Sequence, residues 1–516
     1  MEAKYSTYTH RQGKKVRRPE LGIRMLKNDK GIWKVGKQVE EVINEYSRNM
    51  WGRREELGEE ILTQEEWKRV NPGTGKVTGI LNKELKLEEL NRAIGKLKKG
   101  KTPGEDMITN EIFINMEREE RTKLLKLLEQ CRKESKFPEG WKETELRWIY
   151  KKADPSKIAN YRPIALTDTL YKIYTRMMTE RLEEALETFG ILTELQNGSR
   201  SDRSCMGAIM VMNILMARRL RRNEERPFYV AYIDISKAYD TVSHERLWEI
   251  LEESGIEGTW VENLKELYKG NFIRSMTPEG KTRAIEMKRG IRQGCPLSPL
   301  LFALYTNPIA IAMERANVRK GVEPAMLMYA DDMVVWGETE EEVKEKLQIA
   351  TETMEKLGLQ ISLEKTELQH NKWVEPSRED ESLEIKTKAG VRQIKYQDPR
   401  KALRYLGAWT TTNMETEKGL EILKDKMKER LDRIRGCRAC PSTKVNLIKS
   451  KVVSVWNYTT AVQTIDYKDI MEWEQEFYEA ITTGDLRRER KDMVYEARER
   501  AGLGMTKLTE EYEKTD

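Results

Sequence analysis

The stretch that decides the fold is AMLMYADDMVVW, residues 325–336, in which two apolar arms flank the paired acids Asp331 and Asp332. Short apolar runs with branched and aromatic residues are typical of buried strands. Because aspartate is a favoured turn residue, the pattern predicts a β-hairpin with the acid pair at its turn. Two adjacent aspartates at a turn are common, so this pair indicates no function by itself.

A second apolar run ends in an acid of its own. The segment PFYVAYID, residues 227–234, predicts a buried strand that ends at Asp234. Three carboxylates gathered in one sheet repel each other unless cations lie between them. Oxygen ligands in a chain with only 3 histidines favour Mg²⁺ or Mn²⁺ over zinc. The acids therefore predict a pair of such ions, about 3.5 to 4 Å apart, which is a common device for phosphoryl transfer.

The composition excludes several classes of protein. A length of 516 residues allows about three to five structural units, which excludes a short binding module. The 93 Lys and Arg residues nearly balance the 87 Asp and Glu residues. This balance fits a protein that binds a polyanion on one surface, and it fits solvated helix faces equally well. The sequence has neither a GxSxG elbow nor an HExxH helix, which argues against hydrolases of those kinds.

The sequence gives no sign of secretion or of a membrane span. The longest apolar segment, residues 205–217, is too short to cross a bilayer and predicts a buried core helix. The N-terminus lacks an apolar signal region, and the 5 cysteines are scattered, which favours a reducing compartment. Cys437 and Cys440 have ligand-like spacing, but no second pair follows, so a zinc site is disfavoured and metal binding by this pair stays an open alternative. We expect an intracellular protein, and the basic cluster at Arg11–Arg18 fits a nuclear address, a nucleic-acid arm or a plain tail.

One segment matches a phosphate-loop consensus without the context that such a loop needs. Residues 95–102, GKLKKGKT, have the required letters. A phosphate loop follows a strand and opens a helix, whereas here an amphipathic helix from Leu85 precedes and Pro103 follows. We therefore predict a helix end. Short strands are predicted at 146–152 and 160–164, and helices at 39–46, 168–187 and 203–222.

Three of these segments resemble motifs A, B and C of reverse transcriptases. They are IDISKAYDTV at 233–242, GIRQGCPLSPLLF at 290–302 and YADD at 329–332. The sequence of the second segment, residues 290–302, resembles the non-LTR, LINE-type branch of retrotransposons in particular. Flanking segments at 160–173, 191–204, 358–368 and 405–411 fit further motifs of the family in the expected order. The resemblance runs from about Leu85 to beyond Gly407.

The resemblance implies a right-hand polymerase of the α+β class, with fingers, a palm built on an antiparallel sheet and a helical thumb. We expect an N-terminal extension at 1–84, fingers at 85–226 and partly at 251–300, a palm at 227–412, and a thumb with a helical tail at 413–516. The flanks leave little room for the nucleases of many relatives. We therefore expect a polymerase region without an endonuclease.

The resemblance also implies a metal site. Asp234 and Asp331 would be the main ligands of two Mg²⁺ ions, or of Mn²⁺, with Asp332 in support and the main-chain carbonyl of Ile235 as a further ligand. Lys365 stands where the family has a lysine proposed to protonate the leaving pyrophosphate. As an exposed lysine at a helix end, it also has an ordinary structural explanation.

Nucleotide contacts follow from the same comparison of motifs. Tyr239 matches the aromatic gate beneath the sugar, which would collide with a ribose 2′-hydroxyl and so select deoxynucleotides. Gln293 and Gly294 match the pair that lines the nucleotide pocket, where glycine allows close backbone approach; a merely structural turn is the alternative. Arg162 and Lys151 would hold the triphosphate, although Lys151 competes with Lys152 for the strand register.

The remaining assignments concern nucleic acid. The resemblance implies contacts from Tyr329, from a primer-gripping turn at Tyr405, Leu406 and Gly407, and from a basic thumb helix that includes Lys424, Lys426, Lys428, Arg430 and Arg433. We expect an RNA-directed DNA polymerase, a monomer or weak dimer, that uses dNTPs, an RNA template and a DNA primer and holds the RNA–DNA hybrid. The alternatives are a group II intron-type maturase and a non-catalytic RNA-binding derivative, against which the intact aspartates argue.

Overall fold

The computed structural model describes residues 23–53, 58–221, 227–317, 324–371, 382–414, 417–456, 467–482, 494–495, 505 and 508. The basic cluster at Arg11–Arg18 lies outside them. The chain divides into two compact units. The first comprises Met1–Arg54, Lys83–Met178 and Gly258–Ser298, and the second comprises Glu55–Asn82, Thr179–Glu257 and Pro299–Asp516. The predicted boundaries of fingers, palm and thumb stay a prediction.

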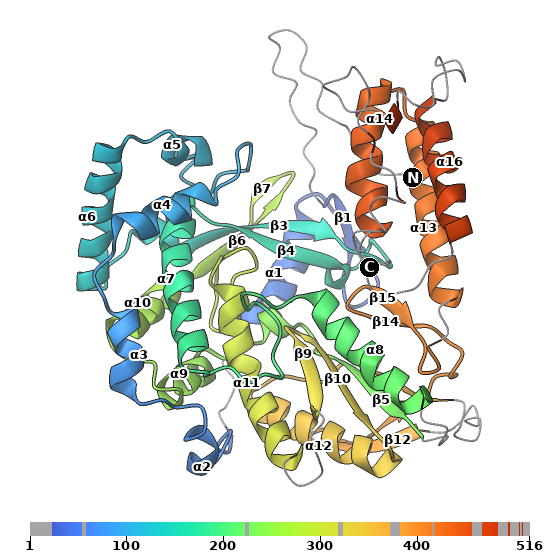
Figure 1. Cartoon of the computed structure of the whole chain (residues 1–516). Helices are drawn as coiled ribbons and strands as arrows, with labels where there is room; N and C mark the ends of the chain where they lie inside the picture. Colours follow the sequence, from blue (N-terminus) through green and yellow to red (C-terminus); the bar gives the residue numbers. More distant parts are fainter. Residues whose placement is uncertain are drawn as a thin grey trace. The chain divides into compact units, whose positions relative to one another are not determined.

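The first unit contains a sheet with strand order β4-β3-β6-β7, in which β8 also pairs with β6 (Figure 1). Its elements are β1 (Met25–Lys27), β2 (Trp33–Val35), α1 (Gln38–Trp51), α4 (Leu87–Gly95), α5 (Asn110–Ile114), α6 (Arg118–Glu134), β3 (Glu143–Tyr150), β4 (Tyr161–Leu166), α10 (Thr259–Tyr268), β6 (Phe272–Thr277), β7 (Gly280–Lys281) and β8 (Ile285–Glu286), with single turns of helix at Glu139–Lys142 and Ile158–Asn160. Helix α7 (Thr169–Thr188) begins in this unit and ends in the second.

Helix α1 is part of the core of the first unit. Its predicted apolar stripe is confirmed, because Val39 and Ile43 are fully buried against Leu26 and Ile158. Its last turn packs with Leu146 of β3 and with residues of β4, β6 and β8. A segment expected to extend from the fold therefore covers the sheet of the first unit.

The phosphate-loop resemblance is excluded by its surroundings. Helix α4 ends at Gly95, a little earlier than predicted, and the next helix, α5, begins only at Asn110. A helix precedes the segment and loop follows it, so the context that a phosphate loop requires is missing. The prediction of a helix end is confirmed.

The second unit contains an antiparallel sheet with strand order β11-β5-β10-β9. Its elements are α2 (Gln64–Trp67), α3 (Thr74–Leu81), α8 (Cys205–Arg221), β5 (Tyr229–Asp234), α9 (His244–Glu253), α11 (Ser298–Asn317, which begins in the first unit), β9 (Met326–Tyr329), β10 (Asp332–Gly337), α12 (Glu340–Lys356), β11 (Glu367–His370), β12 (Ser382–Thr387), β13 (Gly390–Lys395), β14 (Leu403–Tyr405), β15 (Ala408–Thr410), α13 (Glu417–Arg435), α14 (Pro441–Ile448) and α16 (Tyr467–Thr482), with short helical turns at Ala238–Asp240 and Lys449–Val453.

Strands β5 and β10 lie at the centre of this sheet and are buried on both faces. Val230 and Val334 face a cluster formed with α8 and the β14-β15 hairpin. Successive side chains of a strand alternate between faces, so Ala231 and Val335 face the other side, which α12 covers (Figure 1). Burial on both faces explains why these strands read as continuous apolar runs.

Helix α8 differs from its prediction as a buried core helix. Met206, Met210 and Ile214 are 41%, 61% and 47% exposed, whereas Met212 and Met216 are buried. Residues four apart share one face of a helix, so the exposed three form a stripe opposite the packed side. The prediction holds for one face only, where Ile209, Met212, Leu215 and Met216 join the core, because an apolar composition does not tell which helix faces find partners.

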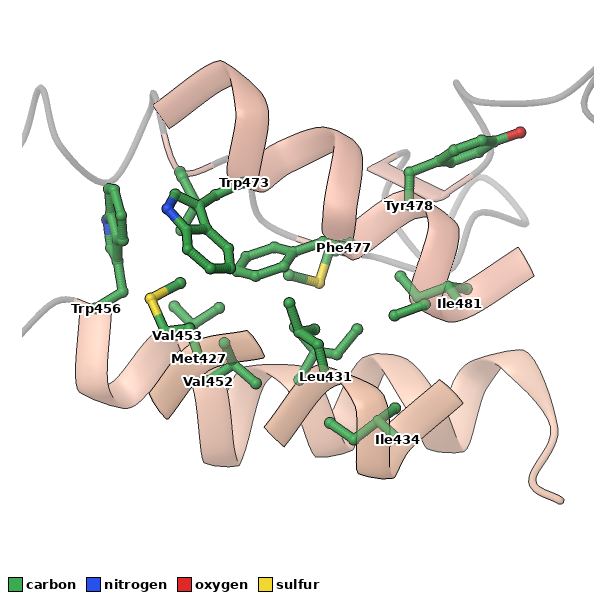
Figure 2. Packing of buried hydrophobic residues seen from close by; sticks show 14 of the residues in the cluster. Met427, Leu431, Ile434, Val452, Val453, Trp456, Trp473, Phe477, Tyr478 and Ile481 are labelled. Atoms are coloured by element: carbon green, nitrogen blue, oxygen red, sulfur yellow. The ribbon is translucent and has the colours of Figure 1, made fainter. Parts of the chain in front are cut away.

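The C-terminal helices enclose a hydrophobic cluster of their own, as expected for the segment after Asn413. Figure 2 shows its members on α13, on the segment that follows α14 and on α16: Met427, Leu431, Ile434, Val452, Val453, Trp456, Trp473, Phe477, Tyr478 and Ile481. No described helix combines the length and the apolar character that crossing a membrane would need.

Candidate active site

The predicted acidic hairpin is present, with a small shift in its turn. Strand β9 ends at Tyr329 and β10 begins at Asp332, so the two-residue turn is Ala330–Asp331. Ala330 has a φ of +56°, in the left-handed region that a residue other than glycine enters at a cost of about 1 to 2 kcal/mol. Asp331 therefore lies at the tip of the turn and Asp332 is the first residue of β10.

Asp234 and Asp332 are brought together by the register of the central strands. Asp234 ends β5, and its direct partner across the ladder is Asp332. Directly opposed residues point to the same face with Cβ atoms about 4.5 to 5.5 Å apart, and like charges in such a pair destabilise the sheet. The two apolar runs thus place an acid pair side by side that needs a cation nearby.

Lys365 supplies a positive charge at this point. Its Nζ lies 3.1 Å from Oδ1 of Asp234. The segment around it is tied to β5, because the Ser362 N–H donates to the Asp234 carbonyl at 2.8 Å. Lys365 lies in a turn and not at a helix end, which corrects the prediction. Helix α12 ends at Lys356, and Gly358 with a φ of +76° follows.

The donor atoms fit a hard divalent cation in kind. Asp234, Asp331 and Asp332 offer only oxygen, the ligand that Mg²⁺ and Mn²⁺ prefer. In the described part of the chain, however, no three His, Cys, Asp or Glu side chains are gathered closely enough to hold a metal ion. Asp234 is instead engaged by Lys365. The ligand set of Asp234, Ile235, Asp331 and Asp332 stays a prediction.

Tyr239 is half-buried close to the acids. Its ring stacks on that of Phe302 in α11, with centroids 4.9 Å apart and an interplanar angle of 15°. Burial, with a smaller contribution from the negative charge of Asp331, raises the pKa of the Tyr239 hydroxyl to about 12. The side chain is therefore a neutral phenol at physiological pH. Its stacking on Phe302 gives it a packing role, and its role as a sugar gate stays a prediction.

The predicted nucleic-acid contacts in the second unit differ in accessibility. A hydrogen bond with Cys205 and, as the smaller cause, burial raise the pKa of the Tyr329 hydroxyl to about 12. Tyr405 is buried, and its ring centroid lies 5.7 Å from that of Tyr232 in β5. Leu406 and Gly407 form the turn between β14 and β15, with φ values of +47° and +95°. The predicted turn is confirmed, and it rests on a tyrosine that belongs to the core.

The basic residues of α13 mostly have protein partners. Lys424 pairs with Asp469 at 2.6 Å, and Arg433 pairs with Glu429 at 2.6 Å. Arg430 donates to the Lys451 carbonyl, and Lys426 lies over the ring of Trp409. Lys428 is exposed and has no partner among the residues that the structure describes. Of the two lysines singled out as nucleic-acid contacts, Lys428 is the one available to a phosphate.

Lys151 and Arg162 belong to the first unit. Arg162 of β4 is opposite Ile149 of β3. Side chains alternate along a strand, so Lys151, two residues after Ile149, continues on the face that carries Arg162, and Lys152 does not. The Lys151 N–H donates to the Asn160 carbonyl at 2.9 Å, which extends the pairing. The register therefore favours Lys151 over Lys152 as the companion of Arg162.

Gln293 and Gly294 lie against β4 in the same unit. The Gln293 carbonyl accepts from the Ala165 N–H at 2.8 Å. Gly294 has a φ of +126°, and a Cβ there would lie 2.8 Å from the Ala165 carbonyl oxygen. Close approach to β4 is thus sufficient to require glycine, and the contact with a nucleotide stays a prediction.

The neighbouring Arg292 is a residue that the sequence reading missed. It is buried, donates to the Trp141 carbonyl at 2.8 Å, and places its guanidinium 4.9 Å from the ring centroid of Tyr171. It anchors the loop that carries Gln293 and Gly294. A single charged residue, in a motif that carries no other charge, was the available signal.

A protein-family model covers the region that contains most of these residues. The model of the family "Reverse transcriptase (RNA-dependent DNA polymerase)" matches residues 149–410, just over half of the chain. The matched region contains every predicted catalytic and nucleotide-binding residue.

Curated relatives come from mobile elements. A Pol polyprotein of the type-1 retrotransposable element R2 of Popillia japonica is 28% identical over 208 residues, which are 38% of this chain and 28% of the relative. An uncharacterized protein of transposon TX1 of Xenopus laevis is 27% identical over 49% of this chain and 20% of its own length. The RNA-directed DNA polymerase of the mobile element jockey of Drosophila funebris is 24% identical over 48% and 27%. The chain thus spans less than a third of each of these relatives.

Proposed function

The chain belongs to the reverse transcriptase family, and on that premise we propose that it is an RNA-directed DNA polymerase of the non-LTR retrotransposon type. It would extend a primer on an RNA template with deoxynucleotides. The observation that carries the proposal is the register that sets Asp234 opposite Asp332, with Asp331 at the adjoining turn. Two strands that are buried on both faces have acids at their adjoining ends. In a sheet with only a structural role, the repulsion between these acids would be unfavourable.

The proposal assigns the parts of a right hand to the described elements. The β11-β5-β10-β9 sheet with α12 would be the palm, the β4-β3-β6-β7 sheet would belong to the fingers, and α13, α14 and α16 would form the thumb. An antiparallel sheet whose two central strands carry acids at adjoining ends supports the first assignment. A helical unit with its own core supports the last.

Two divalent ions, Mg²⁺ or Mn²⁺, would be held by Asp234, Asp331 and Asp332, with the main-chain carbonyl of Ile235. When bound, such ions supply activation of the attacking hydroxyl and stabilisation of the leaving pyrophosphate. The chain itself supplies the common face on which Asp234 and Asp332 stand. Lys365 would give the proton that the pyrophosphate takes up, a task for which its position beside Asp234 is suitable.

The remaining assignments concern the substrates. Tyr239 would lie beneath the incoming sugar, held by its stacking on Phe302. Arg162 and Lys151 would hold the triphosphate, and Gln293 with Gly294 would line the pocket. Lys428 would touch the backbone of the RNA–DNA hybrid, because cations that follow phosphates give affinity without reading sequence.

The test is primer extension on an RNA template by the full chain, with dNTPs against rNTPs and with Mg²⁺ against EDTA. We expect extension with dNTPs and Mg²⁺ only. Asp331→Asn keeps the side-chain size and removes a ligand charge, so extension should fall by about a hundredfold or more while template binding hardly changes. The control is Asp29→Asn, an exposed acid of the first unit, which should extend like wild type. A folded wild type that extends no primer under these conditions would contradict the proposal.

A further inference from the structure

The segment Leu195–Gly198 lies along the edge strand β9 and pairs with it through a single bridge. The Met328 N–H donates to the Leu195 carbonyl at 2.9 Å, and the Asn197 N–H donates to the Met328 carbonyl at 2.8 Å. Gln196 and Met328 form a parallel bridge. The strand that leads into the Ala330–Asp331 turn is therefore fixed from both sides, by β10 on one and by this segment on the other.

Gln196 reaches beyond the edge to the turn itself. Its side chain is fully buried. Oε1 accepts from the Gly198 N–H at 2.9 Å and, at a longer 3.4 Å, from the Ala330 N–H. Nε2 donates to Oγ1 of Thr306 in α11 at 3.1 Å. One glutamine thus joins the turn, the edge segment and a helix of the core.

Gly198 shows how closely the segment and the turn approach each other. A Cβ at this position would lie 2.2 Å from the Ala330 nitrogen and 3.0 Å from the Tyr329 carbonyl carbon. The first of these distances is much shorter than any real contact of a Cβ atom with backbone, so any other residue would push the turn away. The two backbones touch at the residue that precedes Asp331.

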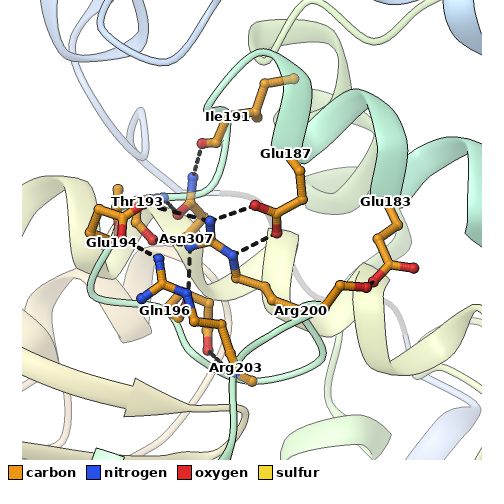
Figure 3. Close-up of polar contacts among 11 residues, drawn as sticks. Glu183, Glu187, Ile191, Thr193, Glu194, Gln196, Arg200, Arg203 and Asn307 are labelled. Atoms are coloured by element: carbon orange, nitrogen blue, oxygen red, sulfur yellow. Dashed lines mark hydrogen bonds and ion pairs between the residues drawn. The ribbon is translucent and has the colours of Figure 1, made fainter. Parts of the chain in front are cut away.

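The segment is itself anchored firmly at its far side, as Figure 3 shows. Arg200 is buried and donates to both carboxylate oxygens of Glu187, at 2.7 and 2.8 Å. It also donates to the carbonyls of Thr193 and Gln196, at 2.8 and 3.1 Å. Asn307 of α11 binds the main chain of the same loop, accepting from the Thr193 N–H at 3.1 Å. The loop is therefore a rigid support for whatever it touches.

We propose that Gln196 is a positioning residue for Asp331. It holds the N–H of Ala330, a residue in a strained conformation, and so fixes the direction in which the next residue presents its carboxylate. The inference rests on the proposed polymerase function, because it assigns Gln196 a share in the same site. A purely structural role would make Gln196 important for stability alone.

The test compares two fully buried glutamines of the second unit. Gln196→Met keeps the shape and removes the hydrogen bonds to Ala330, Gly198 and Thr306. Gln369→Met is the matched control, since Gln369 is also fully buried and holds the Asp398 and Lys401 carbonyls at 2.8 and 2.7 Å, away from the acidic turn. Each variant is measured as the full chain by thermal melt, by amide hydrogen exchange of residues 327–334, by Mn²⁺ binding, and by kcat and KM for a matched dNTP.

Both variants should melt at a lower temperature, by a similar amount. Only Gln196→Met should speed exchange at Ala330, by about tenfold or more, because only there is the local opening made easier. It should also weaken Mn²⁺ binding and lower kcat by about ten- to a hundredfold, with KM hardly changed, as displacement of a reacting group by about 1 Å can do. Equal exchange at Ala330 in wild type and Gln196→Met, or equal kcat losses in the two variants, would overturn the proposal.

Thr306→Val serves if Gln196→Met does not fold. It removes the partner of Nε2 but leaves Gln196 in place, so we expect the same changes at a smaller size, about threefold in kcat. A Thr306→Val protein with wild-type kcat, Mn²⁺ binding and exchange at Ala330 would overturn the positioning role. A wild type that extends no primer contradicts the proposed function and not the positioning role. The positioning role can still be tested in that case, because hydrogen exchange at Ala330 and Mn²⁺ binding do not depend on extension.

Discussion

Lys365 Nζ lies 3.1 Å from Asp234 Oδ1, at the position where two acids face each other across β5 and β10. Their side chains are 53% and 35% exposed, and exposed ion pairs contribute only about 0 to 1 kcal/mol to stability. The pair is therefore of little use for folding. Its effect is to place a positive charge against the Asp234 carboxylate, so the lysine would compete with the proposed divalent cation for this group.

We predict that Lys365→Met changes two properties in opposite directions. The Mg²⁺ concentration for half-maximal extension should fall by about two- to fivefold, because a competing positive charge is removed. At saturating Mg²⁺, kcat should fall by about a hundredfold, which is the lower end of what a lost general acid costs.

Lys401→Met is the control for this prediction. Lys401 pairs with Glu367 at 3.0 Å, so the same chemistry is removed from another ion pair of the unit. A Mg²⁺ titration of initial extension rates measures both quantities. If Lys365→Met and Lys401→Met give the same curve as wild type, Lys365 has no part in the site.

Three strands of the sheet could be predicted because their sequences are almost entirely apolar. Strands β5, β9 and β10 are buried on both faces, so their apolar runs stand out in a charged sequence. The burial of α8 could not be predicted, since Met210 and Met212 are equally apolar and only packing separates them. Nor could α1 be assigned to the first unit, because that depends on contacts with β8, which is distant in the sequence.

The site was predictable where chemistry sits at the end of a strand. The gathering of Asp234, Asp331 and Asp332 in one sheet could be predicted, but the direct pairing of Asp234 with Asp332 needed the structure. Gln196 could not be found in this way, because its proposed role depends on a hydrogen bond with the N–H of Ala330, which is distant in the sequence. The turn position of Lys365 was open to prediction, since Gly358 marks the end of α12.

We predict that Tyr239 makes the protein less stable in strong alkali. Burial raises the pKa of the Tyr239 hydroxyl to about 12, above the value near 10 in an unfolded chain. The folded state therefore holds this proton more tightly, and the resulting stability is complete below pH 10 and lost as the pH rises toward 12. The contribution is about 3 kcal/mol, at about 1.4 kcal/mol for each pKa unit.

Denaturant titrations of wild type and Tyr239→Phe between pH 8 and pH 12 measure this effect. The phenylalanine variant keeps the ring against Phe302 and has no proton to lose, so its stability should fall less steeply above pH 10. Other buried tyrosines contribute equally to both proteins. Parallel curves for the two proteins would mean that Tyr239 titrates alike in the folded and unfolded states.

Binding of a primer–template should depend on salt and on Lys428. Phosphate contacts release counterions, so affinity should drop by about ten- to a thousandfold between roughly 50 and 200 mM salt. Lys428→Ala should reduce the slope of log affinity against log salt by about 1. Lys424→Ala is the matched variant on the same helix, and its slope should stay near that of wild type because Lys424 is paired with Asp469.

Fluorescence anisotropy at four or five salt concentrations gives these slopes. A salt-insensitive affinity of the wild type would show that the basic residues of α13 form a solvated face only. Slopes that are reduced equally in both variants would show that the Lys424–Asp469 pair opens when nucleic acid binds. Slopes that both equal that of wild type would show that Lys428 contacts no phosphate.

Tyr239→Ala should relax the choice of sugar. If the ring lies beneath the incoming nucleotide, a 2′-hydroxyl must collide with it or displace it, and removal of the ring removes this repulsion. We expect the ratio of kcat/KM for a matched rNTP over dNTP to rise by about ten- to a hundredfold, which is about 1.4 to 2.7 kcal/mol of discrimination. Stability should also fall, because the stacking on Phe302 is lost.

Tyr239→Phe separates these two effects. It keeps the ring and its stacking, so its ratio of rNTP to dNTP use should equal that of wild type, and its melting temperature should change little at neutral pH. Loss of packing alone would slow both nucleotides together in Tyr239→Ala and leave the ratio unchanged. A folded Tyr239→Ala with the wild-type ratio would therefore remove Tyr239 from the sugar site and would weaken the placement of the nucleotide above Phe302.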